Sequence, residues 1–378
     1  MIAPILTAGF FLVATTGVHL ASLAVAALRL RRAAPATARG FTDLPPVSLV
    51  RPLCGIDNFA TDTLRSTFEL NYPRYEILFC VASAKDPVIP LIELLMAGQP
   101  EADARLLIGD ERASNNPKLN NVLKGWRAAR YDWIVLADSN VLMPPDYLKR
   151  LFASWRADTG LVASPPIGSQ PQSVWAELEC AFLNTYQARW QYIADACGFG
   201  FAQGKTMLWR RADLDRAGGI EVLAREVAED AAATKVVRDA GRKVQLVDRP
   251  FPQPLGYRTA AEVWHRQVRW ARLRRASFFA ISFPRRCPAA CCRCSRSPLW
   301  RRHSAYRSSR PSYCSVCCGM RARPSWPPPP AGTCLLVIRL SVSCATLCCR
   351  RCFSARCKAT TSSGAVTKCR SSGFTRAA

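Results

Sequence analysis

Acidic residues are missing from the last quarter of this sequence: no aspartate or glutamate follows Ala280, whereas 16 arginines and 2 lysines do. The formal net charge of +25 is therefore uneven, with +18 in residues 281–378 and +7 in residues 1–280. A large positive charge suggests a nucleic acid or an anionic membrane surface as partner. A charge of +7 is ordinary for a protein that lies on an anionic membrane or binds a diphosphate, so we expect no nucleic-acid partner.

Cysteine is scarce in the same first 280 residues. Four of the 18 cysteines lie there, at Cys54, Cys80, Cys180 and Cys197. This usage excludes a disulfide framework and is typical of a reduced, cytosol-facing protein. We interpret Cys180 and Cys197 as small packed residues and not as metal ligands.

Charge is also missing between Ile2 and Leu28, where His19 is the only strongly polar side chain. An apolar helix of this length can cross a bilayer. Four arginines follow closely, at Arg29, Arg31, Arg32 and Arg39. Basic residues on that side place the rest of the chain in the cytoplasm. A cleaved signal peptide is the alternative, but its basic residues would precede the apolar run. We expect a transmembrane signal anchor over 1–32 and a linker over 33–46.

Strand-like and helix-like segments alternate after the linker. Apolar runs predict strands at 47–52, 75–82, 104–109, 132–137, 205–210 and 244–248, and helices are expected at 58–70, 91–97, 118–130 and 231–240. Alternation of this kind predicts an α/β domain with a mostly parallel sheet and helices on both faces. Ligands of such sheets bind at the carboxyl ends of the strands. Asp86 and Asp138 fall at two of these ends.

An acidic pair, Glu229-Asp230, precedes a basic and aromatic motif, Arg266-Gln-Val-Arg269-Trp270. A carboxylate can take a proton from an acceptor hydroxyl, and guanidinium groups with an indole can hold a diphosphate leaving group. The alternative is a surface acid at a helix start followed by a solvated basic helix. The spacing alone does not separate the two interpretations.

Six short phrases occur in one order along residues 45–280. They are Pro52-Leu-Cys-Gly-Ile-Asp57, Phe68-Glu-Leu-Asn-Tyr-Pro73, Asn116-Pro-Lys-Leu-Asn-Asn121, Ala137-Asp-Ser139, Ala228-Glu-Asp230 and Arg266-Gln-Val-Arg-Trp270. Together they resemble the ceramide glucosyltransferase family, a membrane-attached branch of the inverting GT-A glycosyltransferases that includes bacterial enzymes of hopanoid lipid biosynthesis. The resemblance implies a GT-A fold over 47–280, a UDP-sugar donor, a lipid acceptor and a bacterial inner-membrane location.

The resemblance also implies roles for single residues. Asp230 corresponds to the general base, Asp86 to the aspartate that meets the uracil or ribose, and Asp138 to the aspartate that holds a divalent cation. Lys118 contributes to the donor pocket, and Arg266, Arg269 and Trp270 correspond to the motif that grips the leaving diphosphate. A hard cation with oxygen ligands, Mg2+ or Mn2+, suits Asp138.

Simple chemistry agrees with these roles. Inversion needs one base and a stabilised leaving group, whereas a glycosidase uses two carboxylates. Purely structural roles are the alternative: each aspartate can be a helix N-cap, notably Asp86 before Pro87. Trp270 can anchor at a membrane interface.

The basic tail, 281–378, departs from the family pattern, which continues with apolar segments. Shifting the reading frame permits an apolar segment ending in Trp-Arg-Gly near the C-terminus, so we hypothesise a frameshift near residues 276–290 and a disordered or irregular tail. The alternative is a basic zinc or nucleic-acid module around Cys291, Cys294, His303, Cys314 and Cys317, whose spacing matches no standard zinc pattern.

The resemblance therefore implies transfer of glucose or N-acetylglucosamine from a UDP-sugar to a lipid hydroxyl, of a hopanoid polyol or a ceramide, with inversion. If the altered C-terminus removes part of the acceptor site, the chain is inactive as written. The alternative is a catalytically impaired, membrane-tethered protein with a basic zinc- or nucleic-acid-binding tail. Asp230-dependent release of UDP distinguishes the two.

Overall fold

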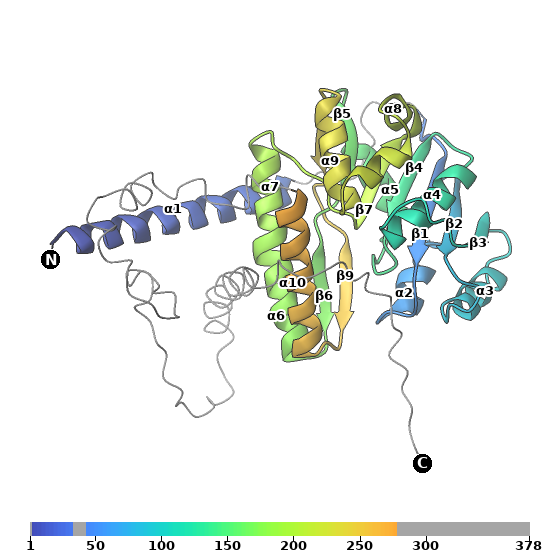
Figure 1. Ribbon diagram of the computed structural model, residues 1–378, viewed down its shortest axis with the longest axis horizontal. Helices are drawn as coiled ribbons and strands as arrows, with labels where there is room; N and C mark the ends of the chain where they lie inside the picture. The colour runs from blue at the N-terminus through green and yellow to red at the C-terminus, as the bar shows by residue number, and fades with distance from the viewer. Residues whose placement is uncertain (1, 33–42, 278–378) are drawn as a thin grey trace, which may run out of the picture.

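The computed structural model describes residues 2–32 and 43–277 (Figure 1). Most of the linker and the basic tail lie outside these residues, so the hypotheses on 281–378 stay predictions. The described chain forms a seven-stranded sheet, in the order β3-β2-β1-β4-β7-β5-β8, and a separate two-stranded sheet, β6-β9.

The large sheet is mostly parallel, as predicted. Its strands are β1 (Val47–Leu53), β2 (Tyr75–Val81), β3 (Ala104–Ile108), β4 (Trp133–Ala137), β5 (Thr159–Ala163), β7 (Thr206–Arg210) and β8 (Lys243–Leu246). Only β7 runs against its neighbours β4 and β5 within this sheet. β1 and most of β2 are buried along their length, because helices cover both faces of a parallel sheet.

Alternate side chains of the strands pack against the two helical layers. Val50, Leu78 and Leu136 face α4 (Pro117–Ala128) and α9 (Glu229–Asp239). Leu49 and Val135 share a cluster with α5 (Tyr147–Ala153) on the other face. α2 (Ala60–Arg65) and α3 (Ile89–Ala97) cover Ile77 and Phe79 of the same face. The period of two along each strand thus builds a three-layer domain.

Two helices begin near the places that the sequence indicates. Asn116 is the N-cap of α4: its side chain accepts hydrogen bonds from Lys118 N and Leu119 N, at 3.0 and 3.3 Å, and Pro117 follows it. α9 begins at Glu229, as the acidic pair suggests. The helix expected over 58–70 is shorter, because only Ala60–Arg65 is helical.

A layer of helices lies beside the small sheet. α6 (Val174–Phe182), the π-helical turn η1 (Leu183–Gln187) and α7 (Ala188–Ala196) form one helical run, and α10 (Ala260–Ser277) packs beside α6 (Figure 1). β6 (Ile167–Pro171) pairs with β9 (Pro252–Gly256) and supports α6. Two short helices, α8 (Arg211–Arg216) and η2 (Ile220–Arg225), complete the described elements.

The N-terminal apolar segment is a single helix, α1 (Ile2–Arg32), whose residues 9–31 are long and apolar enough to cross a membrane. Its C-terminal half packs against α7, and its N-terminal half projects away from the domain (Figure 1). The helix agrees with the expected anchor, while the topology of the chain stays a prediction.

Candidate functional site

Asp138 lies at the carboxyl edge of the large sheet, directly after β4, between two lysines. Its Oδ1 forms an ion pair with Lys118 Nζ at 2.7 Å, and its Oδ2 forms one with Lys205 Nζ at 2.8 Å. Lys118 comes from the first turn of α4, and Lys205 precedes β7. Because β7 is antiparallel to β4, its beginning meets the end of β4 at this edge.

A second carboxylate, that of Glu229, completes the cluster. Its Oε1 lies 2.6 Å from Lys118 Nζ, and its Oε2 accepts a hydrogen bond from Asn116 Nδ2 at 2.8 Å. Lys118 therefore joins two carboxylates that stand 91 positions apart in the chain, and it also donates to Gly204 O at 2.5 Å. We call Lys118, Asp138, Lys205 and Glu229 the lysine–carboxylate cluster.

Asp230 lies next to this cluster and is held by backbone amides. Its Oδ1 accepts a hydrogen bond from Ala231 N at 2.8 Å, and its Oδ2 accepts one from Gly204 N at 3.1 Å. Burial, followed by the negative charge of Glu229, raises the pKa of Asp230 to about 6. A carboxylate whose pKa is close to the working pH is suited to general-base catalysis.

The charges of the cluster shift its own pKa values in the opposite sense. Burial alone would raise the pKa of Asp138, but the two lysine ammonium groups outweigh it and hold that pKa well below its usual range. Burial also opposes ionisation of Lys118, yet Asp138 and Glu229 raise its pKa. The pKa of Glu229 is lowered because the charge of Lys118 outweighs the effect of burial. All three groups are therefore ionised near neutral pH, unlike Asp230 at slightly acidic pH.

Gly204 allows the cluster to close. A Cβ at this position would lie 2.6 Å from Glu229 Oε1 and 2.8 Å from Lys118 Nζ. The backbone can approach both charged groups only because this residue has no side chain. The sequence predicts a loop over 198–204, but nothing in the pattern indicates this contact.

Asp86 holds the backbone at a neighbouring strand end. Its carboxylate accepts hydrogen bonds from Gly55 N, at 3.0 and 3.1 Å, and from Val88 N, at 3.0 Å. These bonds tie the loop after β1 to the turn that precedes α3. The N-cap of α3 is Val88, so the interpretation of Asp86 as the N-cap is wrong. Contact of Asp86 with a donor stays a prediction.

The Arg266–Trp270 motif lies on α10, which packs against α6. Arg266 Nε lies 3.3 Å from Oε1 of Glu179, a carboxylate on α6 whose side chain is fully buried. Burial raises the pKa of Glu179, although Arg266, Arg258 and Lys205 oppose the shift. Lys205 also pairs with Asp138. The carboxylate of Glu179 is therefore influenced by positive charge from both the motif and the lysine–carboxylate cluster.

The other two residues of the motif have different surroundings. Trp270 packs against an apolar cluster with Ala176, Cys180, Leu183 and Leu255. Arg269 is exposed. The motif therefore splits into a buried ion pair, a packed indole and an exposed guanidinium, and within the described residues no direct contact joins it to Asp138 or Asp230.

Several residues of the site escaped prediction. Glu229 belongs to the acidic pair, and Asn116 belongs to the Asn116–Asn121 phrase, so both had a signal in the sequence. Lys205, directly after the glycine-containing loop, had a weak one. Glu179 had none, because a lone acid in an apolar helix usually faces solvent. The expectation that Cys180 is packed is confirmed, whereas Cys197 is exposed and that expectation is wrong.

Asp138 is the candidate ligand that the sequence predicts for a divalent cation. In the part of the chain that the structure describes, no group of three or more His, Cys, Asp or Glu residues could hold a metal ion. Both oxygens of Asp138 already pair with lysines. Mg2+ is often held by one carboxylate together with waters and substrate phosphates, and Asp138 fits this mode.

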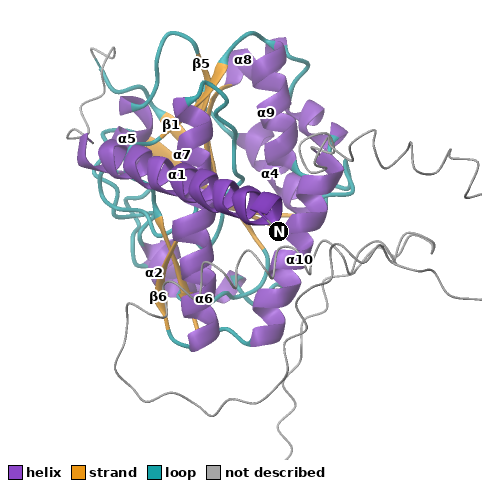
Figure 2. Ribbon diagram, turned by 90° about the vertical axis from the view of Figure 1, so that its left-hand side faces the viewer, coloured by secondary structure: helices purple, strands orange, loops and turns teal. Residues whose placement is uncertain are grey.

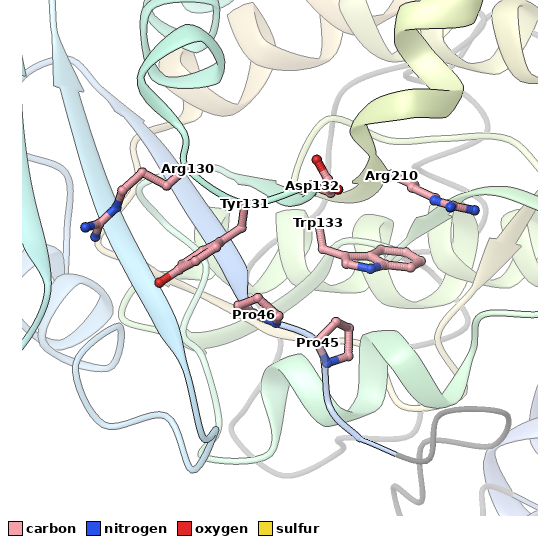
Figure 3. A pocket seen from close by; sticks show the side chains of 7 residues that line it. All are labelled: Pro45, Pro46, Arg130, Tyr131, Asp132, Trp133 and Arg210. Atoms are coloured by element: carbon pink, nitrogen blue, oxygen red, sulfur yellow. The ribbon is translucent and has the colours of Figure 1, made fainter.

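A surface hollow of about 550 Å³ lies at the opposite edge of the sheet, where β1 and β4 begin. Pro45, Pro46, Tyr131, Trp133 and Arg210 are among its lining residues (Figure 3). It contains none of the predicted site residues. Position at the carboxyl edge and concentration of charge therefore identify the candidate site better than concavity does.

Comparison with known proteins gives a family match over most of the chain. The profile of the family described as "Glycosyl transferase family 21" matches residues 13–309. Ceramide glucosyltransferase 1 of Caenorhabditis elegans is 29% identical over 233 residues, which are 61% of this chain and 50% of that protein. Ceramide glucosyltransferase of Komagataella phaffii is 29% identical over 288 residues, with 61% of this chain and 56% of that protein covered. The chain thus spans about half the length of these relatives.

Among solved structures, the chain is similar to a mannosyltransferase of Pyrobaculum calidifontis in complex with GDP-Man and Mn2+. The TM-score is 0.44 at 17% identity, and the similarity covers 71% of this chain and 74% of that one. TarS of S. aureus in complex with UDP-GlcNAc gives a TM-score of 0.39 at 14% identity, over 61% of this chain and 66% of that one.

Proposed function

The chain belongs to glycosyl transferase family 21, and on this premise we propose that it transfers a sugar from a UDP-sugar to a lipid hydroxyl with inversion. Glucose and N-acetylglucosamine are the candidate sugars, and a hopanoid polyol or a ceramide is the candidate acceptor. The relatives named ceramide glucosyltransferase support the lipid acceptor.

The observation that carries the proposal is the setting of Asp230 beside the lysine–carboxylate cluster. Asp230 is the group of this site with a pKa near 6, so it can accept the proton of the acceptor hydroxyl at neutral pH. Its two backbone hydrogen bonds fix the direction of the carboxylate. When one base takes the proton of the acceptor hydroxyl, the acceptor oxygen attacks the anomeric carbon from the face opposite the diphosphate, and the nucleoside diphosphate leaves with inversion.

The donor would bind over the cluster. Lys118 and Lys205 carry positive charge to the carboxyl edge, where the diphosphate of the donor is expected. Asp138 would hold the divalent cation, which neutralises diphosphate charge when it is bound. Asp86 would meet the nucleoside, and Arg266, Arg269 and Trp270 would grip the leaving diphosphate once the donor brings α10 and the sheet edge into one site.

The acceptor would arrive from a membrane. Residues 9–31 of α1 are long and apolar enough to span one, α1 packs on α7, and α10 packs on α6 of the same helical run. We propose a single-pass anchor with the catalytic domain in the cytoplasm of a bacterium, at the inner membrane.

The test is Asp230-dependent release of UDP by the full chain, reconstituted in lipid vesicles with Mg2+ or Mn2+. UDP-glucose and UDP-N-acetylglucosamine are supplied separately, with a ceramide or a hopanoid polyol in the bilayer. Asp230→Asn should lower kcat by about 100- to 10,000-fold. Asp239→Asn, at the exposed end of the same helix, should leave it unchanged.

Two further measurements distinguish the proposed transferase from the alternative, a membrane-tethered binding protein. Chelation of divalent cations, followed by their return, should remove and restore the release if Asp138 holds a cation. No release with any donor and acceptor, from folded protein, would contradict the proposal and favour the membrane-tethered binding protein.

A further inference from the structure

The C-terminal end of α1 is held against the folded domain by Arg29. The guanidinium forms an ion pair with Asp195 of α7, lies 3.2 Å from Asp248 Oδ1 through Nε, and donates to Leu246 O at 2.8 Å. It also stacks over Tyr192, with Cζ 4.9 Å from the ring centroid. Its side chain is 18% exposed, so this arginine serves a protein contact more than a lipid headgroup.

A second contact lies further along the same helix. Arg189 of α7 approaches Nδ1 of His19 at 2.9 Å, two to three turns before Arg29 on α1. These two polar contacts, at different positions along α1, fix the orientation of α1 relative to α7. The direction of α1 therefore sets which face of the domain is presented to a membrane.

The face that follows from this direction is the helical layer. Viewed from the side on which α1 projects, α7 and α6 lie behind α1, with α10 beside them (Figure 2). Exposed aromatic residues follow the α6-η1-α7 run: Trp175, Tyr186 and Trp190 are 45%, 38% and 37% exposed. We call these three side chains the aromatic stripe. Tryptophan and tyrosine are typical of the zone between headgroups and acyl chains.

The neighbouring helix adds charge of the matching sign. α10 contains no acidic residue after Glu262, and Arg269 and Arg272 are exposed on it. Basic side chains near a membrane surface attract anionic headgroups. The aromatic stripe and α10 thus combine apolar anchors with positive charge, as an interfacial surface does.

We propose that the Arg29 contacts hold the domain so that the aromatic stripe and α10 lie in the headgroup region of a bilayer that the projecting N-terminal half of α1 enters. The occupant of this surface is the lipid bilayer, because the same helical layer carries the end of the spanning helix. The inference rests on the proposed membrane attachment and is independent of the sugar transferred. It places the entrance for a lipid acceptor at the membrane surface.

The experiment uses the full chain in nanodiscs of phosphatidylcholine and phosphatidylglycerol, with acyl chains brominated close to the headgroups. Quenching of tryptophan fluorescence reports the proximity of tryptophan to these chains. The double variant Trp175→Phe/Trp190→Phe should lose a large part of the quenching. Trp155→Phe, which removes a half-buried tryptophan that packs on Trp133, should not reduce it.

The Arg29 contacts are tested separately. Arg29→Gln should reduce the quenching that comes from the stripe, because the domain is no longer held, while α1 keeps the protein in the membrane. Arg31→Gln, the exposed neighbour, should leave quenching at the wild-type level. Circular dichroism identifies variants that fail to fold, and the single variants Trp175→Phe and Trp190→Phe then replace the double one.

Each result tests a different part of the proposal. Unchanged quenching in the double variant overturns the proposed surface, and unchanged quenching in Arg29→Gln overturns the role of Arg29. Cross-linking of two copies through the stripe, with no lipid quenching, assigns the face to a second copy instead. Failure of the wild type to float with vesicles overturns the membrane attachment itself. UDP release measured beside these assays shows independently whether the proposed activity fails.

Discussion

Replacing Glu229 by Gln removes the carboxylate whose charge raises the pKa of Asp230. The pKa of Asp230 rises from the 3.8 of an ordinary aspartate to about 6, and burial is the larger cause, with Glu229 second. Because Glu229 is only the second cause and burial remains, Glu229→Gln should lower the pKa of Asp230 from about 6 to a value that is still above 3.8. Lys118, freed from one of its two carboxylates, acts in the same direction.

The sign of the effect on activity follows from the role of Asp230. A general base works only when it is deprotonated, so UDP release should rise with pH through about 6 in the wild type. In Glu229→Gln the same rise should occur at lower pH, because the negative charge that raises the pKa of Asp230 is gone. The height of the plateau is a separate matter, because the variant also loses the ion pair with Lys118.

The assay is the initial rate of UDP release between pH 4.5 and 8, at saturating donor and acceptor, a window chosen to bracket the expected pKa values. Glu226→Gln is the matched control, because Glu226 lies three residues earlier and pairs with Lys235, away from the cluster. Its acid limb should coincide with that of the wild type. An acid limb that stays in place, or moves to higher pH, in folded Glu229→Gln would refute this account of Asp230.

Three further predictions concern the cluster and the Arg266–Trp270 motif. Gly204→Ala should lower the free energy of unfolding by about 1–3 kcal/mol and weaken UDP binding, because the new Cβ would clash with Glu229 and Lys118. Thermal unfolding and calorimetry measure the two effects. Gly98→Ala is the control, because the nearest neighbour of its Cβ would lie at 3.5 Å. Arg269→Lys should raise the Kd for UDP, because lysine lacks the planar guanidinium that binds two phosphate oxygens at once. Arg272→Lys, at an exposed position one turn away, should leave the Kd unchanged. Equal effects of the two variants would contradict a specific role of Arg269 in diphosphate binding. Glu179→Gln should leave the free energy of unfolding within about 1 kcal/mol of the wild type or raise it, because burial outweighs the nearby positive charges at this carboxylate and a neutral side chain avoids that cost. A chemical denaturation midpoint far below that of Glu177→Gln, an exposed neighbour on α6, would contradict this account.

Local patterns in the sequence determined the elements and part of the site. Apolar runs marked β1, β2 and β4, because a strand covered on both faces needs apolar side chains throughout. Asn116 and Pro117 marked the start of α4 by side-chain and backbone chemistry that acts within a few residues. The end of β4 marked Asp138, since ligands bind at the carboxyl ends of parallel strands. In each case the signal and the structure lie in the same short segment.

Only the tertiary structure decided which of these segments meet. The contact of Glu229 with Lys118 joins residues more than a hundred positions apart, and that of Arg29 with Asp195 spans 166. Glu179 reads as a surface acid in sequence, yet packing against α10 buries it opposite Arg266. β6 and β9 contain proline and glycine, so no alternating pattern announced their pairing. Sequence periodicity reports which side of an element is apolar, whereas the partner of a charged group depends on how the completed layers pack.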